Sequence, residues 1–110
     1  MSKKIFVAGP FNDKSEDIKN FRIKSISEYC VKLFNKGDSP ISALLMGLSF
    51  AKFGNLSTDT ETWTTFSETL LKGCDEMHVL CVDGWDKSTG VLAEIELANS
   101  LNIKVTYVEV

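Results

Sequence analysis

Two short apolar runs along the chain have the length and composition of buried β-strands. Residues 4–8 read Lys-Ile-Phe-Val-Ala and are followed by Gly9 and Pro10, which end a strand and turn the chain. Residues 77–82 form a continuous apolar run, typical of a central parallel strand that is covered on both faces. The pattern therefore predicts two central strands, with shorter candidate strands at residues 39–41 and 103–108.

Between these runs, apolar residues recur at the spacing of amphipathic helices. The predicted helices cover residues 15–36, 62–72 and 88–101. A serine that can cap a helix begins the first, and a glycine follows each of the first two. Residues 43–53 are apolar with Gly47 among them, which fits either a loose helix or a loop that covers a substrate.

Strands that alternate with helices form a parallel sheet with right-handed crossovers. The 110 residues provide for one core, so residues 1–110 are expected to form one domain. The predicted class is α/β, a three-layer sandwich with a four- or five-stranded parallel sheet of flavodoxin- or Rossmann-like type. Ligands of such sheets bind beyond the carboxyl ends of the strands, which selects the loops at residues 9–13 and 83–90.

Composition and charge exclude several classes of partner. Apolar residues make up 44% and charged residues 25% of the chain, as in ordinary globular proteins. The net charge is −3, and apart from Lys3 and Lys4 the basic residues are scattered, so no polynucleotide partner is expected. No apolar run is long enough to cross a bilayer, and no signal segment precedes the first strand, which predicts a cytoplasmic protein without a membrane partner.

The sequence contains three cysteines and one histidine, and their spacing does not suggest metal chemistry. Cys30, Cys74 and Cys81 lie in apolar surroundings without a Cys-x-x-Cys pair, so they are interpreted as reduced packing residues. His78 lies inside a predicted strand, where one histidine cannot build a metal site. We therefore expect no metal and no cofactor, and a hydrogen-bonded or edge-exposed His78.

The loop at residues 84–90 feeds a predicted helix and would present backbone N–H groups and a positive dipole end to an anion. Ser88 can add a hydroxyl group, and Gly90 permits close approach of a ligand. Glu94 lies one helical turn beyond Gly90, which makes it a candidate catalytic carboxylate. Alternatively, Glu94 only stabilises the first turns of its helix, where acidic side chains are favoured.

Four segments of the chain together resemble the nucleoside 2-deoxyribosyltransferase superfamily, and most of all its small, often phage-encoded members. These segments are V-A-G-P-F at residues 7–11, S-P-I at 39–41, Cys74-Asp75, and G-W-D-K-S-T-G-V-L-A-E-I at 84–95. The most specific element, S-x-G-V-x-x-E from Ser88 to Glu94, resembles a segment of the deoxynucleoside 5'-monophosphate N-glycosidases. That segment holds a phosphate-binding serine and a nucleophilic glutamate.

The resemblance implies an enzyme that hydrolyses or transfers at the N-glycosidic bond of a deoxynucleoside or deoxynucleoside monophosphate. Glu94 would attack the anomeric carbon as the base leaves, and water or a second base would resolve the glycosyl-enzyme ester. Ser88 and the Gly90 backbone would hold the 5' end, and Gly9 and Pro10 would shape the sugar pocket. A plain tight turn is the alternative for Gly9 and Pro10.

Two aromatic residues complete the candidate binding site. Phe11 and Trp85 would offer their faces to the base. The alternatives are a packing role for Phe11 and a core or interface position for Trp85. Because relatives of this fold complete their pocket across a subunit interface, the resemblance also implies a homo-oligomer, a dimer or larger.

The chain departs from its small relatives at two positions. Where they often carry a histidine shortly after S-P-I, this chain has Ala43, and where they tend to carry an aspartate, it has Ser67. Glu68 or Asp83 would then take over proton transfer, so Asp83 is a second candidate catalytic residue. The alternative is a catalytically silent module of the same fold that sequesters or senses a nucleotide. A purely structural domain is the third possibility.

Overall fold

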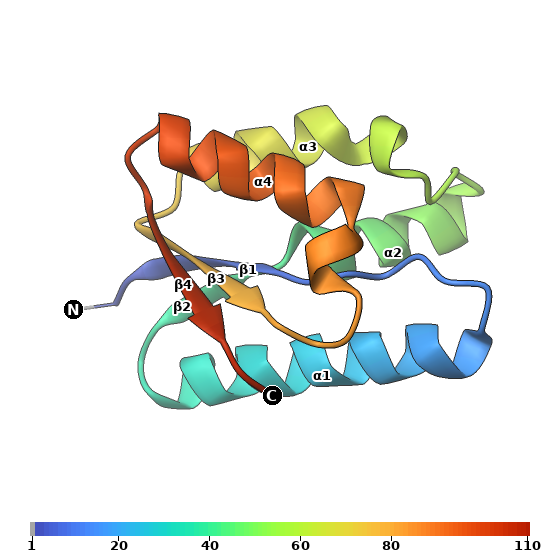
Figure 1. Ribbon diagram of the computed structural model, residues 1–110, viewed down its shortest axis with the longest axis horizontal. Coiled ribbons are helices and arrows are strands. Elements are labelled where there is room, and N and C mark those ends of the chain that lie inside the picture. Colours follow the sequence, from blue (N-terminus) through green and yellow to red (C-terminus); the bar gives the residue numbers. More distant parts are fainter. Residues whose placement is uncertain (1) are drawn as a thin grey trace.

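The computed structural model describes residues 2–110, except for the side chain of Thr60, and contains a four-stranded parallel sheet between helices (Figure 1). The strands are β1 (Lys4–Ala8), β2 (Ser39–Ile41), β3 (Glu76–Leu80) and β4 (Lys104–Val108), in the order β2-β1-β3-β4. The helices are α1 (Glu16–Asn35), α2 (Ala43–Gly54), α3 (Thr60–Lys72) and α4 (Thr89–Ser100), with a 3-10 turn η1 (Trp85–Lys87) before α4. This arrangement confirms the predicted α/β class and a sheet of four strands.

The two central strands, β1 and β3, bury side chains on both faces of the sheet. Phe6 and Met77, partners in register, belong to the apolar cluster under α3 and α4. Val7 and Leu80 point to the opposite face and pack in the cluster formed with α1. Figure 1 shows the resulting layers, with α3 and α4 on one side of the sheet and α1 on the other. The two predicted central strands are confirmed and pair in parallel, although β3 begins one residue before and ends two residues before the predicted range of 77–82.

Serine side chains begin three of the helices, two of them as predicted. Ser15 Oγ accepts a hydrogen bond from the Ile18 N–H, and Ser88 Oγ accepts one from the Val91 N–H. Residues 43–53, for which helix and loop were both open, lie within α2, where Ser42 is the capping residue. The η1 turn was not predicted.

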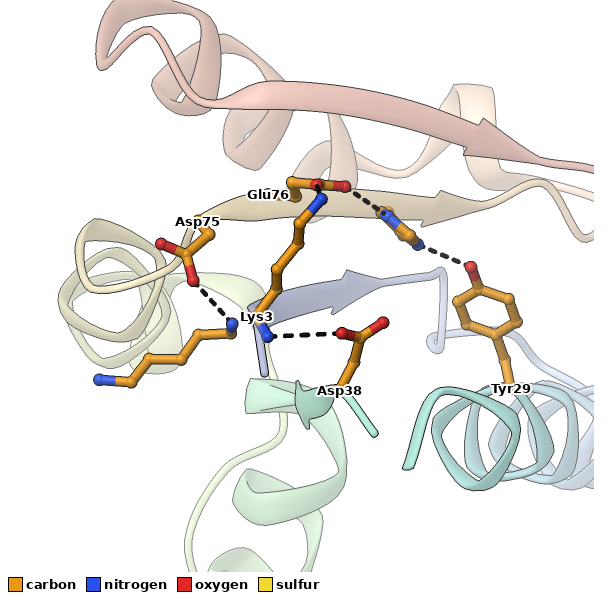
Figure 2. Close-up of polar contacts among 7 residues, drawn as sticks. Lys3, Tyr29, Asp38, Asp75 and Glu76 are labelled. Carbon is orange, nitrogen blue, oxygen red and sulfur yellow. Dashed lines mark hydrogen bonds and ion pairs between the residues drawn. The ribbon is translucent and has the colours of Figure 1, made fainter. Parts of the chain in front are cut away.

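Acidic side chains hold the amino ends of the strands together (Figure 2). The backbone N–H of Lys4 donates to Asp75 Oδ2 at 2.8 Å, and that of Lys3 donates to Asp38 Oδ1 at 3.4 Å. Asp75 and Asp38 immediately precede β3 and β2. The carboxylates therefore supply acceptors to the start of β1, which gives Asp75 of the Cys74-Asp75 segment a structural role.

A second chain of polar contacts runs from the same end of the sheet towards α1. Lys3 Nζ lies 2.7 Å from Glu76 Oε2, and this hydrogen bond lowers the pKa of Glu76 below its usual value. Glu76 Oε1 lies 3.1 Å from His78 Nε2, and His78 Nδ1 lies 2.6 Å from the Tyr29 hydroxyl. Both ring nitrogens of His78 thus have partners, which confirms the expectation of a hydrogen-bonded core histidine.

The three cysteines are free thiols, and burial raises the pKa of each one. This environment fits the packing role that the sequence indicated for them. Within residues 2–110, no cluster of three or more His, Cys, Asp and Glu side chains could hold a metal ion. None of the described helices combines the length and the apolar composition needed to cross a bilayer.

Candidate active site

A cavity of about 490 Å³ lies beyond the carboxyl ends of β1 and β3. The loop after β1 and the loop from Gly84 to Gly90 contribute to its wall, together with residues of α2, α3 and α4. Its volume is in the range of sites that bury small molecules. The cavity therefore lies where ligands of doubly wound sheets bind.

The cavity brings together six of the eight site residues proposed from the sequence: Gly9, Pro10, Phe11, Ser88, Gly90 and Glu94. Asp83 and Trp85 are not among the described residues that line it. The Asp83 side chain is exposed, whereas the Trp85 ring packs against Tyr107 of β4 with a centroid distance of 5.4 Å. Their placement gives no support to a catalytic Asp83 or to a base-stacking Trp85.

Another tryptophan, Trp63 of α3, contributes an aromatic ring to the cavity wall. Its indole Nε1 donates to the Ser57 carbonyl at 2.7 Å, which fixes the ring. A Cβ on Gly47 of α2 would lie 3.3 Å from Trp63 Cε3, so the ring packs closely against the α2 backbone. Gly47 inside an apolar segment was the one sequence signal for this contact.

Glu94 projects from the second turn of α4 and is partly buried at the cavity wall. Burial raises the pKa of its carboxyl group to about 7, while a hydrogen bond with the Ser67 side chain of α3 acts in the opposite direction. Near neutral pH the carboxyl group is therefore divided between its protonated and ionised forms. Ser67 stands where the small relatives tend to carry aspartate, so this partner adds no charge beside Glu94.

The first turn of α4 offers donors to an acceptor-rich ligand. Ser88 Oγ engages the Val91 N–H, while the N–H groups of Thr89 and Gly90 have no acceptor within the described part of the chain. Both residues line the cavity, and Lys87 lies at the same wall. Free N–H groups at a helix N-terminus are suited to binding an anion such as phosphate.

Other ionisable side chains line the cavity at a different wall. Glu68, which the sequence suggested as a substitute for the missing aspartate, lies there next to Ser67. Asp59, in the loop before α3, also lines the cavity. It caps α3 by accepting a hydrogen bond from the Thr62 N–H. Hydrogen bonds from Ser57 and Thr62 lower the pKa of Asp59. Asp59 therefore stays ionised near neutral pH, whereas Glu94 is present in both its protonated and its ionised form.

Comparisons with known proteins agree with this architecture. The model of the family described as "Domain of unknown function (DUF1937)" matches residues 3–110. A solved structure of a 2-deoxyribosyltransferase from Bacillus psychrosaccharolyticus superposes with a TM-score of 0.69 at 24% identity. The match covers 96% of this chain and 72% of that one, and it shows a common fold. The search of curated proteins found no match.

Proposed function

Because the chain belongs to the DUF1937 family, a family of the nucleoside 2-deoxyribosyltransferase superfamily, we propose that it cleaves the N-glycosidic bond of a deoxynucleoside or deoxynucleoside monophosphate. The observation that carries this proposal is the carboxyl group of Glu94 at the wall of the cavity, hydrogen bonded to Ser67. The fold shared with a 2-deoxyribosyltransferase supports the same class of chemistry.

In the proposed reaction, a carboxylate oxygen of Glu94 attacks the anomeric carbon. The carbon–nitrogen bond breaks, its electron pair leaves with the base, and the base takes up a proton from Glu68, the proposed acid at the cavity wall. Water or a second base then displaces Glu94 from the glycosyl ester. The hydrogen bond with Ser67 would hold the attacking oxygen in place, because near-attack geometry requires a fixed nucleophile.

The 5' end of the substrate would lie at the start of α4. Lys87, Ser88, Thr89 and Gly90 follow one another along the cavity wall there. Their N–H, hydroxyl and ammonium groups would favour a 5'-phosphate. Gly9, Pro10 and Phe11 would enclose the sugar from the β1 side. Trp63 takes the place of Trp85 as the proposed aromatic surface for the base.

A binding module that sequesters or senses a nucleotide is the second candidate function. Two observations favour it: Ala43 is buried in the core and offers no group for proton transfer, and Ser67 cannot act as an acid as aspartate would. Glu68, next to Ser67 in the chain, is a further carboxyl group at the cavity wall. If Glu68 does not protonate the base, the cavity would bind a nucleotide without cleaving it.

The two functions are separated by incubation with a panel of deoxynucleosides and deoxynucleoside monophosphates, followed by detection of free base. We expect base release by the wild type and a loss of about three orders of magnitude in Glu94→Gln, which removes the charge with little change of shape. Glu96→Gln, an exposed neighbour on α4, is the matched control and should keep wild-type activity. Nucleotide binding without base release by the wild type would reject cleavage and favour the binding module.

We further propose that the chain self-associates through α2. Met46, Phe50 and Phe53 are exposed at i, i+4 and i+7, so they form one apolar stripe along this helix. Phe53 has the largest exposed fraction among them, 83%. Since α2 also contributes Gly47 and Leu48 to the cavity wall, a second copy docked on this stripe would lie close to the site.

A further inference from the structure

Arg22, in the second turn of α1, is a buried cation at the wall of the cavity, with a side chain only 7% exposed. One terminal nitrogen donates to the Asn12 carbonyl at 2.9 Å and to the Phe11 carbonyl at 3.3 Å. The other donates to the Asp83 carbonyl at 2.9 Å. A single guanidinium group therefore joins the loop after β1 to the loop after β3.

The partners of this guanidinium group are unusual for a buried arginine. In the part of the chain that the structure describes, no carboxylate lies within ion-pair distance of Arg22. Burying a charge is costly unless hydrogen bonds compensate for the lost water, and here three backbone carbonyl groups provide that compensation. The contacts of Arg22 thus act on loop backbone, and they do not neutralise an acidic side chain.

The loop after β3 is shaped to accommodate Arg22. Gly84 has a positive φ of 94°, which favours glycine. A Cβ at this position would also lie 2.5 Å from an Arg22 terminal nitrogen, so a side chain there would displace the guanidinium group. The backbone conformation therefore favours glycine, and the absence of a side chain leaves room for the guanidinium group.

Fixing these carbonyl groups also fixes donors at the cavity wall. In a trans peptide the N–H points opposite to the C=O, so Arg22 sets the direction of the N–H groups of Asn12, Asp13 and Gly84. All three residues line the cavity. Among the described residues, these N–H groups have no acceptor, and they are therefore available to a ligand.

We propose that Arg22 is a positioning residue that locks the loops after β1 and β3 together and so orients the backbone donors of the cavity towards an acceptor-rich ligand. The contacts of Arg22 carry the proposed locking of the loops. The proposed effect of Arg22 on catalysis rests on the proposed function. Arg22 would act through the loops, without touching the anomeric carbon or the base.

The test compares Arg22→Met, which removes the charge at similar length, with Arg22→Lys, which keeps the charge but loses the planar fork. Lys24→Met is the matched control, because Lys24 lies on the same helix in an exposed ion pair with Glu28. Amide hydrogen exchange in residues 9–13 and 83–88 is measured for each variant, together with kcat and KM for base release.

For Arg22→Met we expect exchange to accelerate about tenfold or more in the loop after β3, where the N–H groups of Trp85, Lys87 and Ser88 are hydrogen bonded, with little change in α3 and β4. KM should rise about tenfold, and the pH profile of kcat should stay as in the wild type, because Glu94 is untouched. Arg22→Lys should lie between the wild type and Arg22→Met. Lys24→Met should match the wild type in every measurement.

Unchanged exchange in the loop after β3 would overturn the proposal, and so would acceleration spread evenly over the chain, which would indicate a role in global stability alone. A wild-type KM in a variant whose loop after β3 has opened would also overturn it. If the wild-type protein cleaves no nucleoside, the proposed function fails, and the exchange measurement still decides whether Arg22 locks the loops.

Discussion

At the scale of single residues, the proton affinity of Glu94 connects the packing of the cavity with its chemistry. Removal from water favours the neutral carboxyl group, and the Ser67 hydrogen bond favours the carboxylate. A nucleophile must be ionised, so the proposed reaction should become faster as the pH rises through about 7. The rise in pH that ionises Glu94 should, by contrast, lower the stability of the folded protein.

The difference in stability between Glu94→Gln and the wild type should therefore depend on pH. Because the pKa rises from 4.5 to about 7 on folding, the folded chain binds more protons between these values, and the wild type loses stability as the pH rises through this window. Relative to the wild type, Glu94→Gln should gain up to about 3 kcal/mol between about pH 4 and pH 8. Urea unfolding at both pH values measures the gain, and Glu96→Gln should show none. An equal effect of Glu94→Gln at both pH values would contradict a raised pKa.

At the scale of elements, the start of α4 combines helix capping with the proposed binding of the 5' end. Ser88→Ala should lower the free energy of unfolding by about 1 kcal/mol, because the Val91 N–H loses its acceptor. It should also weaken binding of a deoxynucleoside monophosphate more than binding of the nucleoside, as measured by calorimetry. Ser15→Ala, at the start of α1, should show a similar loss of stability without any change in this preference. Equal weakening of both ligands in Ser88→Ala would remove Ser88 from the phosphate site.

Sequence patterns identified those elements whose signals are local. Each of these signals occupies only a few consecutive residues. The short apolar runs predicted the sheet, the capping serines predicted the starts of α1 and α4, and the segment from Ser88 to Glu94 pointed to Glu94 as a site residue. The pattern did not decide α2, because its residues are apolar on several sides, and Gly47 lowers helix propensity. In the structure, Gly47 packs against the ring of Trp63 of α3, and this contact favours the helical form of α2.

The remaining site features depend on contacts between distant parts of the chain. Arg22 contacts Asp83 across 61 positions, so nothing near it in the sequence marks it as part of the cavity wall. Trp85 follows Gly84, whose left-handed backbone begins the turn that places the indole ring against Tyr107 and not in the cavity. The backbone direction after Gly84 thus bears on where the Trp85 ring lies, and a residue pattern does not encode that direction.

At the scale of the whole molecule, the exposed stripe on α2 predicts an oligomer. We expect light scattering to give at least twice the mass of one chain, and Phe53→Ser to shift the protein to monomer, because a stable interface needs roughly 1,200 Å² or more of buried surface. Phe34→Ser is the matched control, since Phe34 is 71% exposed on α1, the helix that covers the opposite face of the sheet from α3 and α4. A monomeric wild type would contradict the prediction.

The two polar regions of the molecule lie at opposite ends of the parallel strands. The contacts of Lys3, Asp75 and Glu76 are at the amino ends (Figure 2). The cavity is at the carboxyl ends. In many enzymes stabilising substitutions reduce activity, because the residues that limit stability are those of the site. Here the contacts at the amino ends of the strands lie apart from the cavity, so directed evolution for heat resistance can act on them without changing the residues of the proposed site.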